Sequence, residues 1–531
     1  MAAAAPRLLD CLRRPIDYNG FWHVFIARNL SREWLNLQHP PAYLVLLRIS
    51  DAVSRSVLSY RFWGLVAGVG SVFLVGRILL GLDCRAATAA LGAAVMGFAI
   101  NPIRLSNEVE SYSVCILLVL ASFSSYLRLV GPPGVAGGGH SRVAFASLTS
   151  VAISFHYFAG LYTTACIGAP FLLAALVPEY RETMRRNLPK RWLADLAMIL
   201  PPLAVGVYLY EAQAKRWVMP LSSLPSFYYQ PLRDTVPSFL LRNLRGTFNL
   251  FSPVAVSRAR IAVPVLAALL AACLWAMVRE RRLDERSSRR LFPLAFLAIL
   301  LVGGMVLGLC GMYPFGGQMR HQFLIFVFAL LAGMVAVDAT IRDAPSRGRV
   351  AALGGLAAVL ATDFFVQLPA LLHPAPDRLA PILEVHDADF RRTGNVSADQ
   401  FGLVALFTRY YNSSFRFAER VSDSPPIDRY EVGSGGRRFD VLAFRNWWIF
   451  EFWDDRLFAE LSQAWSKRSA TCNGLLRVSG TVFDQPERLR PDARFRSTLE
   501  ARLRAAGAAR GLSVRNLDAS DFLDVYAEFC R

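Results

Sequence analysis

The sequence is poor in charged residues. Only 18% of its 531 residues are Asp, Glu, Lys or Arg, whereas soluble domains contain about 25%. Hydrophobic residues make up 54% of the chain. This scarcity of charge excludes an ordinary soluble enzyme and predicts a polytopic membrane protein.

The cysteines lack the spacing of a metal or redox site. None of the eight lies in a Cys-x-x-Cys pair, which argues against a zinc ribbon and a thioredoxin-like centre. Cys472 and Cys530 both lie in the C-terminal region, for which we expect an oxidising compartment. Such a compartment permits a disulfide between them, but the sequence leaves open whether one forms.

An internal repeat is also absent, and few ionisable groups fall inside the apolar stretches. Asp338 and Asp363 lie near the ends of theirs. Transporters usually place ionisable residues in mid-membrane and show paired repeats with broken helices. We therefore keep a multi-span transporter or flippase of a lipid-linked or small solute only as the alternative to a membrane enzyme.

About ten apolar stretches approach the length needed to cross a bilayer. They are 60–81, 86–101, 112–129, 143–157, 159–177, 192–210, 261–278, 291–310, 321–338 and 350–370. We expect residues 1–59 to be a first outer loop with an interfacial helix, residues 60–370 to be the transmembrane domain, and residues 371–531 to be an extracytoplasmic domain.

The net charge of +18 follows this topology. Basic residues cluster in three short loops, around 181–191, 279–290 and 342–349. Short basic loops remain in the cytoplasm, so the excess charge needs no nucleic-acid partner. The segments then expected outside are Asp17, Glu108, 211–260, 311–320 and 371–531. Since the chain would begin outside with no apolar signal segment, we also expect an upstream helix.

Two outer segments are expected at the membrane surface. Residues 31–58 are too polar to span, and an amphipathic helix is predicted there. Its apolar face would comprise Tyr43, Leu44, Leu46, Leu47 and Ile49. Loop 211–260 mixes aromatic and basic residues, which is typical either of an interfacial anchor or of a mobile cover over a phospholipid-like substrate.

The C-terminal region has a different character. Charges become frequent, and Phe439, Val441, Ala443 and Phe444 form a strand candidate. Residues 452–467 and 494–509 are predicted to be amphipathic helices. We expect a small α/β domain with its own core.

Two acidic segments are candidates for chemistry at the membrane surface. Asp17 lies among aromatic residues and Glu108 lies in the sequence Ser106–Tyr112. A carboxylate can deprotonate an acceptor hydroxyl or bind a metal that activates it. The alternatives are that Asp17 caps a loop and that Glu108 pairs with Arg104. We expect Glu110 to be solvated.

Cationic and imidazole side chains are the candidates for substrate contacts. Arg320 and His321 begin a span and could stabilise a departing phosphate or anchor the helix at the interface. His39 could bind a metal or the backbone of its own loop. His156 could serve the site or make a polar helix contact.

Several motifs in this order resemble one enzyme family. They are Asp17 with His39-Pro-Pro-Ala-Tyr43, Tyr60–Arg77 with Gly64, Ser106-Asn-Glu-Val-Glu-Ser-Tyr112, Phe155-His-Tyr-Phe158 and Tyr313-Pro-Phe-Gly-Gly-x-x-Arg320. The set resembles membrane glycosyltransferases of the GT-C fold, specifically family 39, with protein O-mannosyltransferases and lipid A aminoarabinose transferases. The resemblance covers about residues 15–340.

The resemblance implies a GT-C-like polytopic helical protein of the bacterial inner (cell) membrane. It would transfer a sugar from a polyprenyl-phosphate donor. The acceptor would be a lipid, glycan or protein hydroxyl on the extracytoplasmic face, and the transfer would be inverting. Asp17 would act as the base and Glu108 as the second acid. Residues implied in substrate binding are His39, Tyr112, His156, Tyr157, Arg320 and His321. Here Tyr18 and Glu110 depart from the family pattern, which leaves a divalent metal open.

Overall fold

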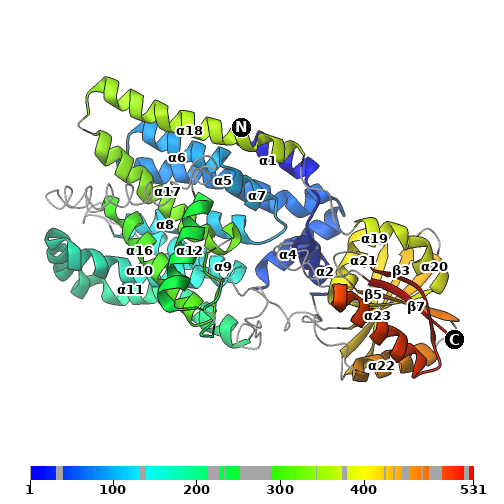
Figure 1. Ribbon diagram of the computed structural model, residues 1–531. Helices are drawn as coiled ribbons and strands as arrows, with labels where there is room; N and C mark the ends of the chain where they lie inside the picture. Colours follow the sequence, from blue (N-terminus) through cyan, green and yellow to red (C-terminus); the bar gives the residue numbers. More distant parts are fainter. Residues whose placement is uncertain are drawn as a thin grey trace. The chain divides into compact units, whose positions relative to one another are not determined.

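The computed structural model describes residues 2–30, 40–130, 139–212, 227–232, 234–251, 289–316, 318–342, 344–373, 380–423, 426–434, 437–444, 455–467, 470–477, 493–519 and 525–531. The chain forms two compact units (Figure 1). The first comprises Met1–Pro15 and Leu30–Ala375, and the second comprises Ile16–Asn29 and Pro376–Arg531. The boundaries expected at 59/60 and 370/371 stay a prediction, because they concern the membrane and these units reflect packing.

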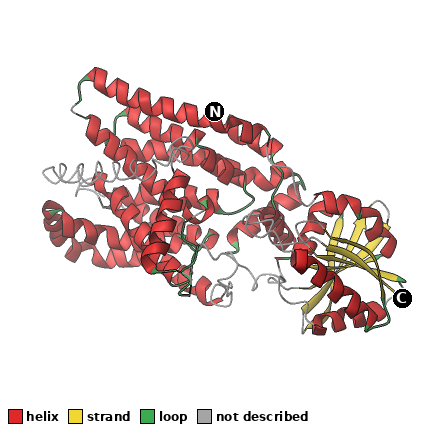
Figure 2. Ribbon diagram, in the orientation of Figure 1, coloured by secondary structure: helices red, strands yellow, loops and turns green. Residues whose placement is uncertain are grey.

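The described part of the first unit is helical (Figure 2). Its α-helices are α1 (Ala4–Arg13), α4 (Ala42–Val53), α5 (Val57–Gly81), α6 (Ala86–Phe98), α7 (Ile100–Asn107), α8 (Tyr112–Leu129), α9 (Gly139–Phe155), α10 (Ala159–Leu176), α11 (Pro178–Ala212), α12 (Val236–Phe251), α16 (Phe292–Leu309), α17 (Met319–Ile341) and α18 (Ser346–Leu372).

Among the described residues, seven helices are long and apolar enough to cross a membrane, or eight if one bent pair forms a single span. The bent pair, α6 and α7, corresponds to the predicted stretch 86–101. Stretch 143–157 is a helix of 17 residues, α9. Stretch 261–278 lies outside the described residues. The protein is an integral membrane protein, as the composition predicts.

The bend between α6 and α7 brings α7 against α5. The two helices are bent by 51° at Ala99, whose backbone is extended. A Cβ atom on Gly64 of α5 would lie 2.5 Å from the carbonyl oxygen of Ser106 in α7. Only glycine permits this approach without a shift of the backbone. The glycine at position 64 therefore fixes the segment that leads to Glu108.

Helix α4 lies within residues 31–58, where an amphipathic helix is predicted, and its position at the membrane interface stays a prediction. Tyr43, Leu44 and Leu47 are buried, whereas Ile49 is 48% exposed. Asp51 is buried instead and accepts a hydrogen bond from the Tyr60 hydroxyl at 2.5 Å. A partner on α5 thus decides which face is inside, since a buried polar group needs a hydrogen bond.

The second unit contains a seven-stranded sheet with the order β2-β3-β4-β1-β5-β7-β6. The strands are β1 (Asn395–Asp399), β2 (Ser414–Asp423), β3 (Pro426–Ser434), β4 (Arg437–Phe444), β5 (Cys472–Arg477), β6 (Ser513–Ala519) and β7 (Val525–Cys530). Strand β1 is parallel to β4 and β5, and the other pairs are antiparallel. The predicted α/β domain and its strand at 439–444 are confirmed.

Helices cover both faces of this sheet (Figure 1). The helices are α2 (Tyr18–Arg28), α19 (Ala380–Val385), α20 (Asp387–Thr393), α21 (Gln400–Tyr410), α22 (Asp455–Ser466) and α23 (Ala493–Ala508). Leu442 and Phe444 of β4 pack in one core with Trp465 of α22. Phe439 of β4, an odd number of residues before Leu442, lies on the opposite face and contacts Tyr410 of α21, with ring centroids 5.3 Å apart. Because successive side chains of a strand point to opposite faces, each helical layer has its own core. Helices α22 and α23 confirm the two amphipathic helices predicted from the sequence.

Helix α2 packs within the second unit, although it lies far from that unit in sequence. Phe25 of α2 contacts Phe407 and Tyr430, with ring centroids 5.4 Å apart in both pairs. The Arg28 guanidinium lies 4.9 Å from the centroid of the Phe407 ring. These aromatic contacts explain why residues 16–29 join the C-terminal domain rather than the helical unit.

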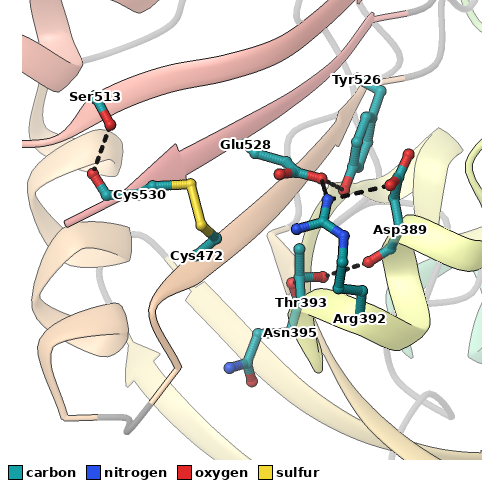
Figure 3. The surroundings of a disulfide bond; sticks show 9 residues. All are labelled: Asp389, Arg392, Thr393, Asn395, Cys472, Ser513, Tyr526, Glu528 and Cys530. Atoms are coloured by element: carbon teal, nitrogen blue, oxygen red, sulfur yellow. Dashed lines mark hydrogen bonds and ion pairs between the residues drawn. A yellow bond between two sulfur atoms is a disulfide. The ribbon is translucent and has the colours of Figure 1, made fainter.

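Cys472 and Cys530 form a disulfide across the antiparallel pair β5 and β7 (Figure 3). This settles the possibility that the sequence left open. Glu528, two residues before Cys530, is 1% exposed, pairs with Arg392 and accepts a hydrogen bond from the Tyr526 hydroxyl. Figure 3 shows this ion pair joining α20 to β7 beside the disulfide.

Candidate active site

Three motifs that are distant in sequence meet in the first unit. The Tyr112 ring lies 5.2 Å from the His156 ring, and the His156 ring lies 6.1 Å from the Tyr313 ring, between centroids. Tyr313 also lies 6.2 Å from His321. We call these four residues, with Glu110 and Arg320, the tyrosine–histidine cluster. The structure thus brings together Tyr112, His156, Arg320 and His321, which the sequence predicts as substrate-binding residues.

A helix break places His156 in the cluster. Helix α9 ends at Phe155 and α10 begins at Ala159, so the chain breaks at the predicted point. The Nδ1 atom of His156 accepts a hydrogen bond from the backbone N–H of Phe158 at 3.1 Å. In the neutral ring Nε2 then carries the proton. Tyr157, in the same break, is half-buried.

The turn that carries Tyr313 depends on a glycine. Gly316 has φ +86°, and a Cβ atom there would lie 2.6 Å from Oδ1 of Asn243 in α12. Asn243 is 3% exposed. Phe239, one turn earlier in α12, packs near Gly308 at the end of α16. Helix α12, which lies in loop 211–260, therefore supports the turn between α16 and α17 that precedes Arg320.

Glu110 is buried, which corrects the expectation that it is solvated. Only 3% of it is exposed. Its carboxylate acts electrostatically on Tyr112 and Tyr313, and the Arg320 guanidinium acts on the same two rings with the opposite sign. The cluster therefore combines a negative and a positive group around two phenols.

The phenol of Tyr313 is held in its neutral form. Burial raises its pKa well above the usual value, nearby Tyr228 and Cys115 raise it further, and Arg320 opposes the rise. The Tyr313 hydroxyl oxygen is buried and has no hydrogen-bond partner among the described residues. A neutral buried hydroxyl can donate a hydrogen bond to an anion.

Glu108 lies at the end of α7, where it is half-buried. Its backbone N–H bonds to the carbonyl oxygen of Arg104 at 3.0 Å, and the two side chains interact electrostatically. Burial raises the pKa of the Tyr43 phenol; Glu110 adds to that rise, Arg61 opposes it, and Glu108 adds again. Glu108 and Glu110 therefore both lie near Tyr43.

Asp17 is exposed and caps a helix. Its Oδ1 atom accepts a hydrogen bond from the Gly20 N–H at 2.9 Å, at the start of α2. This is the capping alternative that the sequence left open, and it leaves the second carboxylate oxygen available. Asp17 belongs to the second unit. His39 lies outside the described residues.

The sequence interpretation missed two buried arginines of the first unit. Arg7 is 0% exposed and Arg61 is 2% exposed. Arg7 donates to the carbonyl oxygens of Met96 and Gly97 at 2.8 and 2.7 Å, and Arg61 binds backbone carbonyls near both acidic segments. A signal that could have found Arg61 is its charge within the apolar stretch 60–81, since charged residues within spans are usually functional or paired.

The described residues were also tested for a metal site. The one group of three close metal-ligating side chains among them is Cys472, Glu528 and Cys530. The two sulfur atoms are joined in the disulfide and therefore cannot bind a metal as thiolates. We therefore derive no step through a metal.

Comparisons with known proteins support the fold. No protein-family model and no curated protein matches the chain. The chain is similar to the crystal structure of ArnT from Cupriavidus metallidurans bound to undecaprenyl phosphate, at 12% identity and a TM-score of 0.53, covering 99% of this chain and 96% of that one. The apo state of the same protein gives 12% identity, a TM-score of 0.55, and coverage of 99% and 97%.

The chain thus has a GT-C-like fold, and the predicted fold class is confirmed. At 12% identity the likeness establishes the architecture, so the activity has to be argued from the residues.

Proposed function

We propose that the protein is a membrane glycosyltransferase that moves a sugar from a polyprenyl-phosphate donor to an acceptor hydroxyl. The observation that carries the proposal is the convergence of Tyr112, His156, Tyr313 and Arg320 around the buried Glu110. The similar ArnT structure with bound undecaprenyl phosphate supports this donor class. By analogy the site faces the outside of a bacterial inner membrane.

The reaction is an inverting displacement at the anomeric carbon. The acceptor oxygen attacks C1 of the sugar while a carboxylate takes the hydroxyl proton. The bond between C1 and the phosphate oxygen breaks, and the polyprenyl phosphate leaves with the bonding electron pair. The protein must therefore supply a base for the acceptor and positive charge for the leaving group.

The tyrosine–histidine cluster suits the phosphate. Arg320 supplies a two-point donor for phosphate oxygens, and the neutral Tyr313 hydroxyl supplies a third. His321 and Tyr112 line the same cluster. We also assign His156 and Tyr157 to substrate binding. His39 is kept as a substrate-binding residue because of the sequence resemblance.

The carboxylates supply the proton chemistry. We assign Asp17 as the base and Glu108 as the second acid. Glu110 joins them, because a buried carboxylate beside a cation and two phenols is costly unless it serves binding or catalysis. The acceptor stays open among lipid, glycan and protein, and no observation in the described residues favours a transporter.

The test is release of free polyprenyl phosphate from defined polyprenyl-phosphate sugars by purified protein in nanodiscs. Asp17→Asn keeps the capping oxygen but removes the base, so turnover should fall about 100- to 10,000-fold. Turnover of Asp17→Asn within about threefold of the parent would exclude Asp17 as the base. Failure of the parent with every donor would exclude the proposed activity.

A further inference from the structure

Arg61 joins the two chain segments that lead to the proposed acids. Its Nε atom donates to the carbonyl oxygen of Asn107 at 2.7 Å, and its Nη2 atom donates to that of Pro15 at 2.8 Å. Its Nη1 atom donates to the carbonyls of Cys11 and Arg14 at 2.8 and 2.6 Å. All three nitrogen atoms of one buried guanidinium are therefore engaged by backbone.

These carbonyls lie at the ends of two helices. Helix α1 ends at Arg13 and α7 ends at Asn107. The last carbonyls of a helix have no partner within it, and a cation is favourable at that end of the helix dipole. Arg61 satisfies both requirements for α1 and α7 together, from its position in the second turn of α5.

The position of these ends in the sequence gives them a functional meaning. Asn107 directly precedes Glu108, and Pro15 is two residues before Asp17. The backbone that enters each acidic segment is therefore fixed by the same side chain. Arg61 also acts on Tyr43, on which Glu108 and Glu110 act as well, so its charge lies close to the second acidic segment.

We propose that Arg61 is a positioning residue, which sets the backbone leading to Asp17 and to Glu108 through one guanidinium. The effect of Arg61 on catalysis rests on the proposed function, whereas its positioning of the backbone does not. A lysine cannot replace it, because one ammonium group cannot reach carbonyls on two helix ends in the planar geometry of a guanidinium.

A purely structural arginine provides the matched control. Arg290, 2% exposed, bonds to Asp338 at 2.9 Å and to the carbonyl oxygen of Val335 at 3.4 Å, both in α17. Arg61→Lys and Arg290→Lys each keep the charge and remove a buried guanidinium. The unfolding temperatures of the two variants then give the general loss of stability when a buried arginine becomes lysine. A local effect of Arg61→Lys can be judged against that loss.

Amide hydrogen exchange of the full-length protein in nanodiscs tests the positioning directly. In Arg61→Lys, exchange should become about tenfold faster in peptides covering residues 11–20 and 105–111, and not in residues 335–342. Arg290→Lys should show the reverse. Unchanged exchange of both acidic segments in folded Arg61→Lys protein would overturn the inference, whatever reaction the protein catalyses.

Turnover then tests the catalytic consequence. Arg61→Lys should lower kcat per folded molecule about 10- to 100-fold with little change in the donor KM, because misplaced acids slow the chemical step. When Arg61→Lys is combined with Asp17→Asn or Glu108→Gln, the further loss of kcat should be much smaller than in the parent, since Arg61 acts through these acids. A fully additive loss would overturn the positioning role, whereas an inactive parent would count against the proposed function alone.

Discussion

Tyr313 stacks on Phe158, with ring centroids 4.6 Å apart and an angle of 11° between the planes. The contact joins the helix break after α9 to the turn before α17. Two motifs that are 155 residues apart in sequence thereby share one face of the cluster, with the His156 ring alongside. The stack fixes the Tyr313 ring, so the phenol hydroxyl can be tested separately from the packing of the ring.

Replacing Tyr313 with Phe should keep the stack and remove one donor. We expect turnover per folded molecule to fall about 10- to 100-fold, because the lost hydroxyl would bind the leaving phosphate, while the unfolding temperature stays near that of the parent. Tyr313→Ala also removes the stack and should lower both quantities. Full turnover of Tyr313→Phe would exclude the hydroxyl from the site.

Glu110→Gln should affect activity as severely as Glu108→Gln, although the sequence favoured only Glu108. A buried carboxylate near Arg320 and two phenols contributes charge that an amide cannot supply. Each variant should lose about 100-fold in turnover or more. The comparison is made on protein of equal monodispersity. If Glu110→Gln is fully active, its burial is structural and Glu108 alone remains the candidate in this segment.

The sequence predicts much of the cluster because its motifs lie at the ends of spans, where hydropathy marks the chain clearly. Tyr112 begins α8, His156 breaks the chain between α9 and α10, and Arg320 lies in the first turn of α17. Helix ends on the same side of a membrane lie near one plane, so their residues can meet. The partner of each residue was not predictable, since it is set by how the helices pack.

Burial of polar groups was the part that the sequence could not predict. Glu110 is expected to be solvated from its local sequence, yet it is buried, and the charged Asp51 is buried as well. Their surroundings come from other helices: the Tyr60 hydroxyl donates a hydrogen bond to Asp51, and Glu110 lies near Tyr313 and Tyr43. The burial of such a group depends on how helices that are distant in sequence pack around it, which local sequence patterns do not reveal.

Removal of the Cys472–Cys530 disulfide should destabilise the C-terminal domain. The bridge closes a segment with a sequence separation of 58 residues, and the chain-entropy model gives about 4 kcal/mol for such a loop. Cys472→Ala with Cys530→Ala should lower the unfolding temperature of this domain, as should reductant on the parent. Cys310→Ala, which removes an exposed free cysteine, is the control. A transition insensitive to reductant would contradict the prediction.

Single cysteines should reveal which side of the membrane each loop occupies. The free native cysteines are replaced and the disulfide is kept. Leu232, Met312 and Val385 are exposed, and cysteine at each should react with an impermeant maleimide on intact cells. Cysteine at Glu182 or Arg347, in loops expected inside by their positive charge, should not. The reverse pattern would place the site in the cytoplasm and favour a nucleotide-sugar donor.

Substitution of Arg320 distinguishes phosphate binding from anchoring at the interface. If Arg320 holds the donor phosphate, Arg320→Ala should lower turnover about 100-fold or raise the donor KM strongly, since a charge-assisted contact is lost. Arg320→Lys should restore activity only in part, because an ammonium cannot form a two-point contact. An interface anchor would behave differently: Lys would restore everything, and Ala would lower expression rather than turnover. Turnover per folded molecule, measured side by side for the Ala and Lys variants, decides between the two roles. Full activity of the Lys variant would move the phosphate site to the basic residues of loop 211–260.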